Sequence, residues 1–125
     1  MNKEIVSTKA APAAIGPYSQ AVKAGTVVYT SGQIGLDPVS GELVPGFEAQ
    51  VRQAFANLEQ VAQAAGGSLA NAAKFTLFLT DLGQFGVVNQ IMGELVPQPY
   101  PARSTVGVAS LPKGAAFEVE AILVI

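Results

Sequence analysis

The clearest candidates for chemistry are an arginine and a pair of glutamates near the end of the chain. Arg103 is one of two arginines, and it lies in Pro101-Ala102-Arg103-Ser104-Thr105-Val106, directly before an apolar run. A guanidinium fixed beside β-forming residues can bind a carboxylate through two parallel hydrogen bonds. Fifteen residues later, Glu118-Val119-Glu120 offers a carboxylate that can act as a base. The sequence therefore predicts an anion clamp near a proton-transfer group.

Each of these residues also has a purely structural interpretation. Arg103 can instead form an ion pair with a glutamate of a neighbouring strand, such as Glu118. The alternation of side chains along a strand places Glu118 and Glu120 on one face, where they can be a solvated pair at a sheet edge. The opposite face of that strand then carries Phe117, Val119 and Ala121. The spacing alone does not decide between the functional and the structural interpretation.

Two earlier segments contain residues that suit a ligand site. Tyr18 follows the rigid turn Gly16-Pro17, so its hydroxyl either binds a substrate or water, or is a satisfied hydroxyl of the core. Ser31 and Gly32 lie in Thr30-Ser31-Gly32-Gln33-Ile34-Gly35, whose small residues let a ligand approach the backbone. An ordinary transition from a strand to a turn has the same composition. These residues are therefore weaker candidates than Arg103.

The amino-acid composition limits the possible chemistry. The chain has no histidine and no cysteine, so the commonest general base, the commonest metal ligand and a thiol nucleophile are all missing. Its net charge is −2, and its 7 lysines and arginines form no basic run, which argues against nucleic acid as a partner. Catalysis would have to rest on carboxylates, Arg, Lys, hydroxyls, backbone groups and water.

Length and hydrophobicity indicate a single domain that associates with copies of itself. A chain of 125 residues fits one domain, residues 1–125. Half of the residues are hydrophobic (50%) and only 13% are charged, so we expect a homo-oligomer, with a tightly packed monomer as the alternative. Residues 1–6 lack the apolar region of a signal peptide, and no stretch is long enough to span a membrane. We therefore expect a cytoplasmic protein.

The order of the expected elements predicts an α/β fold, with both helices on one face of a mixed sheet. Hydrophobic alternation and turn residues indicate strands over residues 4–7, 18–24, 26–31, 75–80, 102–108 and 117–124. Helical periodicity indicates helices over residues 47–65 and 82–96. The uncovered face of the sheet would then be closed by a sister subunit.

The two predicted helices differ in how clearly their faces are marked. The first ends at Gly66-Gly67, and its polar face is expected to carry Gln50, Arg52, Gln53, Asn57, Glu59, Gln60 and Gln63. The second begins after Asp81, a plausible N-cap, and its inward face is expected to carry Phe85, Val88, Met92 and Leu95. Asn89 is a polar residue in this apolar helix, and by itself it indicates only a local hydrogen bond.

Several motifs taken together resemble the Rid (YjgF, reactive intermediate deaminase) family. They occur in the family's order and cover essentially the whole chain: Gly16-Pro17-Tyr18-Ser19-Gln20-Ala21, Thr30-Ser31-Gly32-Gln33-Ile34, Gly66, Pro101-Ala102-Arg103-Ser104-Thr105-Val106 and Glu118-Val119-Glu120-Ala121. The chain is most similar to the RidA-type branch, because the arginine needed for deaminase activity is present. The resemblance implies a chorismate-mutase-like fold, a homotrimer built as a barrel, and three pockets at subunit interfaces.

The resemblance also implies an activity and a set of site residues. The reaction would be the hydrolysis of 2-imino acids, or their enamine tautomers, to 2-keto acids and ammonia without a cofactor. Arg103 would bind the substrate carboxylate, and Glu118 would position or activate water. The remaining members of the implied site are Tyr18 and Ser31 as hydrogen-bonding groups, and Gly32, Asn89 and Thr105 as lining groups. Thr105 stands where a common form of the motif has a cysteine.

Other roles that the resemblance suggests are a non-catalytic ligand-binding or chaperone-like holdase trimer and a translation-inhibiting ribonuclease. The acidic balance and the missing histidines argue against the ribonuclease. A holdase demands only an exposed apolar surface, so the composition is compatible with it. Loss of activity on changing Arg103 would separate the deaminase from the holdase.

Overall fold

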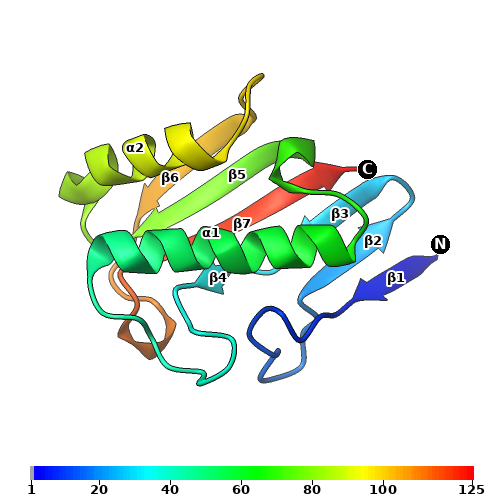
Figure 1. Cartoon of the computed structure of the whole chain (residues 1–125), viewed down its shortest axis with the longest axis horizontal. Helices are drawn as coiled ribbons and strands as arrows, with labels where there is room; N and C mark the ends of the chain where they lie inside the picture. The colour runs from blue at the N-terminus through cyan, green and yellow to red at the C-terminus, as the bar shows by residue number, and fades with distance from the viewer. Residues whose placement is uncertain (1) are drawn as a thin grey trace.

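A seven-stranded sheet and two α-helices make up the regular structure in the computed structural model, which describes residues 2–125 (Figure 1). The strands are β1 (Lys3–Val6), β2 (Ala21–Ala24), β3 (Val27–Thr30), β4 (Gln33–Ile34), β5 (Ala72–Leu79), β6 (Ala102–Gly107) and β7 (Phe117–Val124); the helices are α1 (Phe47–Ala64) and α2 (Phe85–Leu95). Their order in the sheet is β1-β2-β3-β7-β5-β6, and β4 pairs with β7 beyond β3. Only β5 and β6 are parallel, so the sheet is mixed, as predicted.

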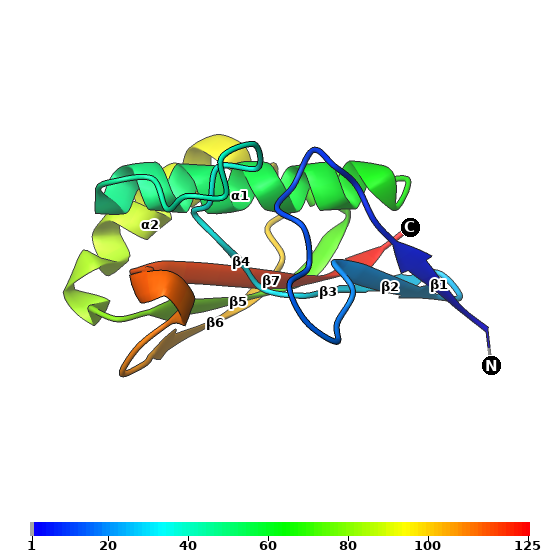
Figure 2. The ribbon, with the colours of Figure 1, turned by 90° about the horizontal axis from the view of Figure 1, so that it is seen from below.

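Both helices lie on the same face of the sheet (Figure 2), which confirms the predicted arrangement. Alternate residues of the inner strands point to the helices and are fully buried, as the pattern along β7 shows: Phe117, Val119 and Leu123 have no exposed surface. Helix α1 contributes Phe55 and Leu58 to the same core, and they too are fully buried. Burial of such side chains is the main source of folding free energy. The other face of the sheet carries no helix in the part of the chain that the structure describes.

Helix α1 ends where the sequence predicts, and the backbone shows why. Gly66 adopts a positive φ of 100°, which a residue with a side chain rarely adopts. The Gly67 N–H donates to the Ala62 carbonyl at 2.9 Å, and the Gly66 N–H donates to the Gln63 carbonyl at 3.0 Å. These two bonds form a Schellman motif and satisfy the last carbonyls of the helix.

The predicted polar face of α1 is wrong at two positions, because Gln50 and Asn57 are buried. The Asn57 side chain donates to the carbonyl oxygens of Ile34 and Leu36 at 3.2 and 2.9 Å. The Gln50 side-chain oxygen accepts from the Ala116 N–H at 2.9 Å. A buried amide is stable only when it is hydrogen-bonded, and here each amide bonds to backbone groups far away in the sequence. Helix α1 thereby fixes β4, which directly follows Ser31 and Gly32, and the start of β7, which carries Glu118.

Helix α2 begins later than predicted. Asp81 is a cap, as expected, but its side chain accepts from the Gly83 N–H at 2.9 Å and so caps a 3-10 turn, Leu82–Gln84. The α-helix proper starts at Phe85. Leu95 was expected to face inward, yet it is 39% exposed. The buried stripe of this helix instead consists of Val88, Ile91 and Met92 and continues into Val96.

Candidate active site

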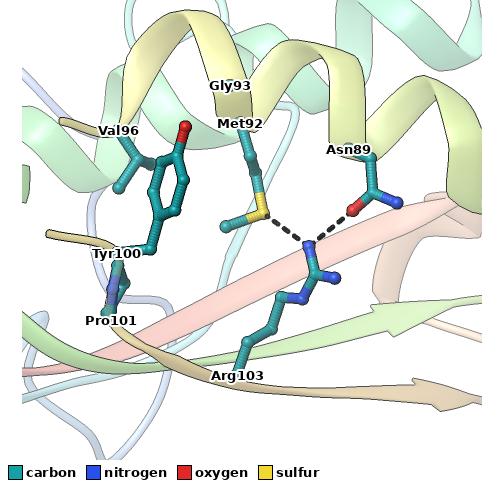
Figure 3. A pocket seen from close by; sticks show the side chains of 7 residues that line it. All are labelled: Asn89, Met92, Gly93, Val96, Tyr100, Pro101 and Arg103. Atoms are coloured by element: carbon teal, nitrogen blue, oxygen red, sulfur yellow. Dashed lines mark hydrogen bonds between the residues drawn. The ribbon is translucent and has the colours of Figure 1, made fainter. Parts of the chain in front are cut away.

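Arg103 extends from the edge strand β6 toward helix α2. It pairs in register with the buried Phe75 of β5, so its side chain lies on the helix-bearing face of the sheet. The guanidinium Nη1 donates to the Asn89 side-chain oxygen at 2.6 Å and lies 3.7 Å from the Met92 sulfur (Figure 3). The guanidinium carbon also lies 4.9 Å from the centre of the Phe85 ring. Four side chains of two elements thus form one local arrangement.

The guanidinium borders a pocket of about 390 Å³, here called the arginine pocket. Figure 3 shows the side chains that line it, from α2 and from the segment that leads into β6: Asn89, Met92, Gly93, Val96, Tyr100, Pro101 and Arg103. Among residues 2–125, ion pairs occur only between Arg52 and two glutamates of the surface, Glu48 and Glu94. The alternative of an ion pair between Arg103 and Glu118 is therefore not realised within the described chain. Within residues 2–125, the Arg103 guanidinium has no carboxylate partner.

Glu118 lies on the other face of the sheet. It belongs to β7, which is an interior strand paired with β4 and with β5, so the alternative of a solvated pair at a sheet edge is wrong. Burial raises the pKa of the Glu118 carboxyl above its usual value, and the negative charge of Glu120 adds to this rise. A carboxylate with a raised pKa is a better proton acceptor than an ordinary glutamate.

A bulge in the sheet makes room for the Glu118 carboxylate. Tyr29 pairs with Ile122 and Gln33 with Val119, so residues 30–32 of one strand face only residues 120–121 of the other. Gly32 lies in this bulge, and a methyl group there would overlap the carboxylate of Glu118. Gly32 therefore permits the observed position of the glutamate, in addition to any contact that it makes with a ligand.

The same carboxylate faces a second cavity, here called the carboxylate pocket, of about 550 Å³. Tyr18, Ser31 and Gly32 line it together with Glu118, and Lys113 lies at its border. The Ser31 hydroxyl donates to the Ser19 carbonyl at 2.6 Å, so toward a ligand it can act only as an acceptor. The Tyr18 hydroxyl accepts weakly from a backbone N–H, at 3.4 Å, and its own proton is free.

The predicted site residues thus fall into two groups on opposite faces of the sheet. Tyr18, Ser31, Gly32 and Glu118 share the carboxylate pocket, whereas Arg103 and Asn89 share the arginine pocket. Thr105 lies two residues beyond Arg103 on the helix-bearing face of β6, is half-buried, and lines neither pocket. The structure therefore does not bring the clamp and the base together in one chain.

Comparison with known proteins identifies the family. The family model described as "Endoribonuclease L-PSP" matches residues 8–125. A protein of Dermatophagoides farinae named 2-iminobutanoate/2-iminopropanoate deaminase is 46% identical over 98% of this chain and 97% of its own length. This chain belongs to the Rid (YjgF) family.

Solved structures of Rid proteins have the same fold as this chain. RidA from an Antarctic Psychrobacter species has a TM-score of 0.96 and 51% identity, with 98% of this chain and 99% of that one covered. TdcF of E. coli, solved with bound serine, has a TM-score of 0.90 and 42% identity and covers 98% of either chain. The predicted family and the mixed sheet with two helices are thereby confirmed, and the prediction of an enzyme agrees with the deaminase name of the relative.

Some residues that shape the site of this Rid protein are missed by sequence reasoning. Gln20 is buried, and its side chain holds the loop before β2 in place. Its amide oxygen accepts from the Thr8 N–H at 2.7 Å, and its amide nitrogen donates to the Pro12 carbonyl at 2.8 Å. Its place beside Tyr18 in the quoted motif was the available indication. Phe85 and Met92 were assigned to the core by periodicity, although both contact Arg103.

Within residues 2–125, no three His, Cys, Asp or Glu side chains come together as a possible metal site. In the same residues no helix has the length and apolar character needed to cross a membrane.

Proposed function

We propose that this protein is a 2-iminobutanoate/2-iminopropanoate deaminase that hydrolyses 2-imino acids to 2-keto acids and ammonia. The observation that carries the proposal is the guanidinium of Arg103, which borders a pocket and has no carboxylate partner among the described residues. The name of a relative with 46% identity over almost the whole chain supports the same activity. A 2-imino acid supplies both a carboxylate for this clamp and an electrophilic carbon.

The proposed reaction needs few catalytic groups. Water adds to the imine carbon while Glu118 accepts one of its protons and passes that proton to the imine nitrogen, so a tetrahedral amino alcohol forms. Glu118 then accepts the hydroxyl proton of this intermediate and passes it to the nitrogen as the carbon–nitrogen bond breaks, so the carbonyl forms and ammonia leaves. Arg103 holds the carboxylate so that the imine carbon lies beside the water, and such positioning alone gives a large rate gain. The raised pKa of Glu118 suits both proton transfers.

The two catalytic groups require a second chain, because they face opposite sides of the sheet. We propose a homotrimer with a chorismate-mutase-like barrel, in which the arginine pocket of one subunit meets the carboxylate pocket of the next. The uncovered sheet face supports this assembly, since it exposes Tyr29, Ile122 and Val124 by 52%, 36% and 49%. Association would bury these apolar side chains and join the clamp to the base.

The remaining site residues have narrower proposed roles. Tyr18 donates a hydrogen bond to substrate or water with its free proton, and Ser31 accepts one. Gly32 gives the substrate access to the backbone, while Asn89 and Thr105 line the arginine side of the site. We also propose a cytoplasmic location and no nucleic-acid or membrane partner.

Two other activities have less support. The description of the matching family model names an endoribonuclease, but a net charge of −2 and the lack of histidine give no basic surface and no usual acid–base pair. A holdase would use the exposed apolar sheet face, and it would not need Arg103. The dependence on Arg103 therefore separates the deaminase from the holdase.

The assay for the deaminase measures keto acid and ammonia released from imines that an amino-acid oxidase generates in situ. We expect wild type to accelerate release, Arg103→Ala to reduce the rate by about a hundredfold or more, and Arg52→Ala to match wild type. Arg52 is the suitable control because it is the only other arginine and pairs with surface glutamates. Equal rates for wild type, Arg103→Ala and a blank without protein would refute the deaminase.

A further inference from the structure

The hydroxyl of Thr30 occupies a place in the sheet that a backbone carbonyl normally takes. The Ile125 N–H donates to the Thr26 carbonyl at 2.8 Å, so residues 26 and 125 form a hydrogen-bonded pair of the antiparallel ladder. Such pairs recur at every second position, and the register between β3 and β7 makes residues 30 and 121 another of them. In a regular ladder the Ala121 N–H would therefore donate to the Thr30 carbonyl. It donates instead to the Thr30 hydroxyl oxygen, at 2.9 Å.

This exchange of acceptors lies where the bulge between β3 and β4 begins. The register with β7 ends one pair before Thr30 and resumes at Gln33, which is opposite Val119. Because the hydroxyl satisfies the N–H of the buried Ala121, the Thr30 carbonyl can leave the ladder without leaving this donor unpaired. The strand can then place three residues, 30–32, opposite two.

The next residue of the bulge, Ser31, is held from the other side. Its N–H donates to the Gln20 carbonyl at 2.9 Å, and its hydroxyl donates to the Ser19 carbonyl at 2.6 Å. The side chain of Gln20 is itself buried and bonded to the preceding loop. The bulge is thus fastened to β7 through Thr30 and to the segment before β2 through Ser31.

The bulge leaves no spare room beside the proposed base. A methyl group on Gly32 would overlap the carboxylate of Glu118. A regular ladder would place Gly32 opposite Val119, where Gln33 lies now. Any relaxation of the bulge toward that register moves Gly32 relative to the carboxylate, which would be displaced from its half-buried place into the carboxylate pocket.

We propose that Thr30 is a positioning residue for Glu118, because its hydroxyl accepts the ladder bond of Ala121 and so maintains the bulge against which the carboxylate is held. The proposal rests on the proposed function for the role of Glu118 as the base, whereas the bulge and its bonds are features of the fold. Loss of the Thr30 oxygen should slow the chemical step and leave substrate binding nearly unchanged.

Kinetics of two Thr30 variants separate the oxygen from the bulk of the side chain. Thr30→Val keeps the shape of threonine and loses the acceptor, so kcat should fall about tenfold or more while KM stays within about twofold. Thr30→Ser keeps the oxygen, and its kcat should lie within about twofold of wild type. Thr26→Val is the matched control, since it makes the same chemical change at an exposed position in the turn before β3. Thr30→Val with the kcat of wild type would overturn the positioning role.

The position of the carboxylate has a readout of its own, the pH titration of the Glu118 carboxyl carbon in 13C-labelled protein by NMR. Glu118→Gln identifies the resonance. Burial raises the pKa of Glu118, so a carboxylate displaced into the pocket should titrate at lower pH in Thr30→Val than in wild type or Thr30→Ser. The same titration in all three proteins would contradict a displaced carboxylate. The titratable groups of residues 2–125 that face Glu118 are unchanged in every variant: Glu120 of β7, and Tyr18 and Lys113 of the carboxylate pocket.

The outcomes separate this inference from the proposed function. If wild type releases no keto acid from imines but the Glu118 titration moves in Thr30→Val and not in Thr30→Ser, the deaminase is refuted and the positioning by Thr30 stands. If wild type is an active deaminase and Thr30→Val matches it in kcat and in the titration, only the role of Thr30 is refuted. Should Thr30→Val not fold, Thr30→Ala and Thr30→Ser give the same comparison, since both lack the methyl group and only serine keeps the oxygen.

Discussion

Arg103 and Glu118 extend from opposite faces of one sheet, although both side chains belong to strands next to β5. Phe75 of β5 pairs with Arg103 on one side and with Ala121 on the other, and these three positions share the helix-bearing face. Glu118 is three residues from Ala121, an odd number, so alternation places it on the other face. A single chain therefore presents half of the proposed site on each face of its sheet.

Gly32 is predicted to be essential for the position of the Glu118 carboxylate. Gly32→Ala would place a methyl group on the carboxylate oxygen and displace it, so kcat should fall by about a hundredfold while the fold is kept. Steady-state kinetics and circular dichroism check this. Gly86→Ala is the control, because it has open space around it and should stabilise α2 by about 0.5–1 kcal/mol with normal activity. Normal turnover by Gly32→Ala would show that the glutamate position is unimportant.

The acidic limb of the pH–rate profile should respond to Glu120. Burial is the main reason that the pKa of Glu118 is raised, and the charge of Glu120 is the second. A base loses activity as the pH falls through its pKa, so the limb should lie above the usual pH for a glutamate. Glu120→Gln should lower the Glu118 pKa and move the limb to lower pH. If the acidic limb of Glu120→Gln lies at the same pH as that of wild type, either Glu118 is not the base or the charge of Glu120 does not raise its pKa.

Glu118→Gln should stabilise the folded protein at neutral and alkaline pH. The folded state raises the pKa of Glu118, so it binds this proton more tightly than the unfolded state, and ionised Glu118 destabilises the fold above the folded pKa. The cost disappears as the pH falls below the unfolded pKa. Thermal unfolding should therefore show a higher Tm for Glu118→Gln than for wild type at about pH 8, and equal Tm values at about pH 3. A variant less stable at about pH 8 would contradict the assigned burial cost.

Asn57 should contribute more to stability than the other polar residues of α1. Asn57→Ala leaves the carbonyl oxygens of Ile34 and Leu36 without donors in a buried place, and this should lower the free energy of unfolding by about 2–3 kcal/mol. Gln63→Ala, on the exposed face of the same helix, should change it by less than about 0.5 kcal/mol. Chemical denaturation measures both. Equal effects would mean that the bonds to Ile34 and Leu36 contribute nothing.

Much of the fold follows from periodicity in the sequence. The helix expected over residues 47–65 is observed as Phe47–Ala64, and the last strand is observed over the predicted residues 117–124. In both, hydrophobic side chains repeat with the period of the element and are bounded by glycine or proline turns. The prediction was less accurate for the start of α2. An aspartate such as Asp81 can cap a 3-10 turn as well as an α-helix, and here it caps the 3-10 turn Leu82–Gln84.

The division of the site could not be predicted from the sequence. Alternation shows that Glu118 and Glu120 share a face, but only the register between β5, β6 and β7 relates that face to Arg103. The buried amides of Gln50 and Asn57 were missed for a related reason, since a polar residue on a helix is expected in solvent unless its distant partner is known. Both cases depend on contacts between segments far apart in the chain.

The measurement that tests the shared site most directly is complementation between two inactive variants. Arg103→Ala and Glu118→Gln subunits are mixed in equal amounts, dissociated and reassembled, and keto-acid release is compared with that of each variant alone. If each site takes Arg103 from one subunit and Glu118 from its neighbour, about one quarter of the sites become intact, and about one quarter of the wild-type activity should return. A mixture no more active than the two variants alone would contradict a site shared between chains.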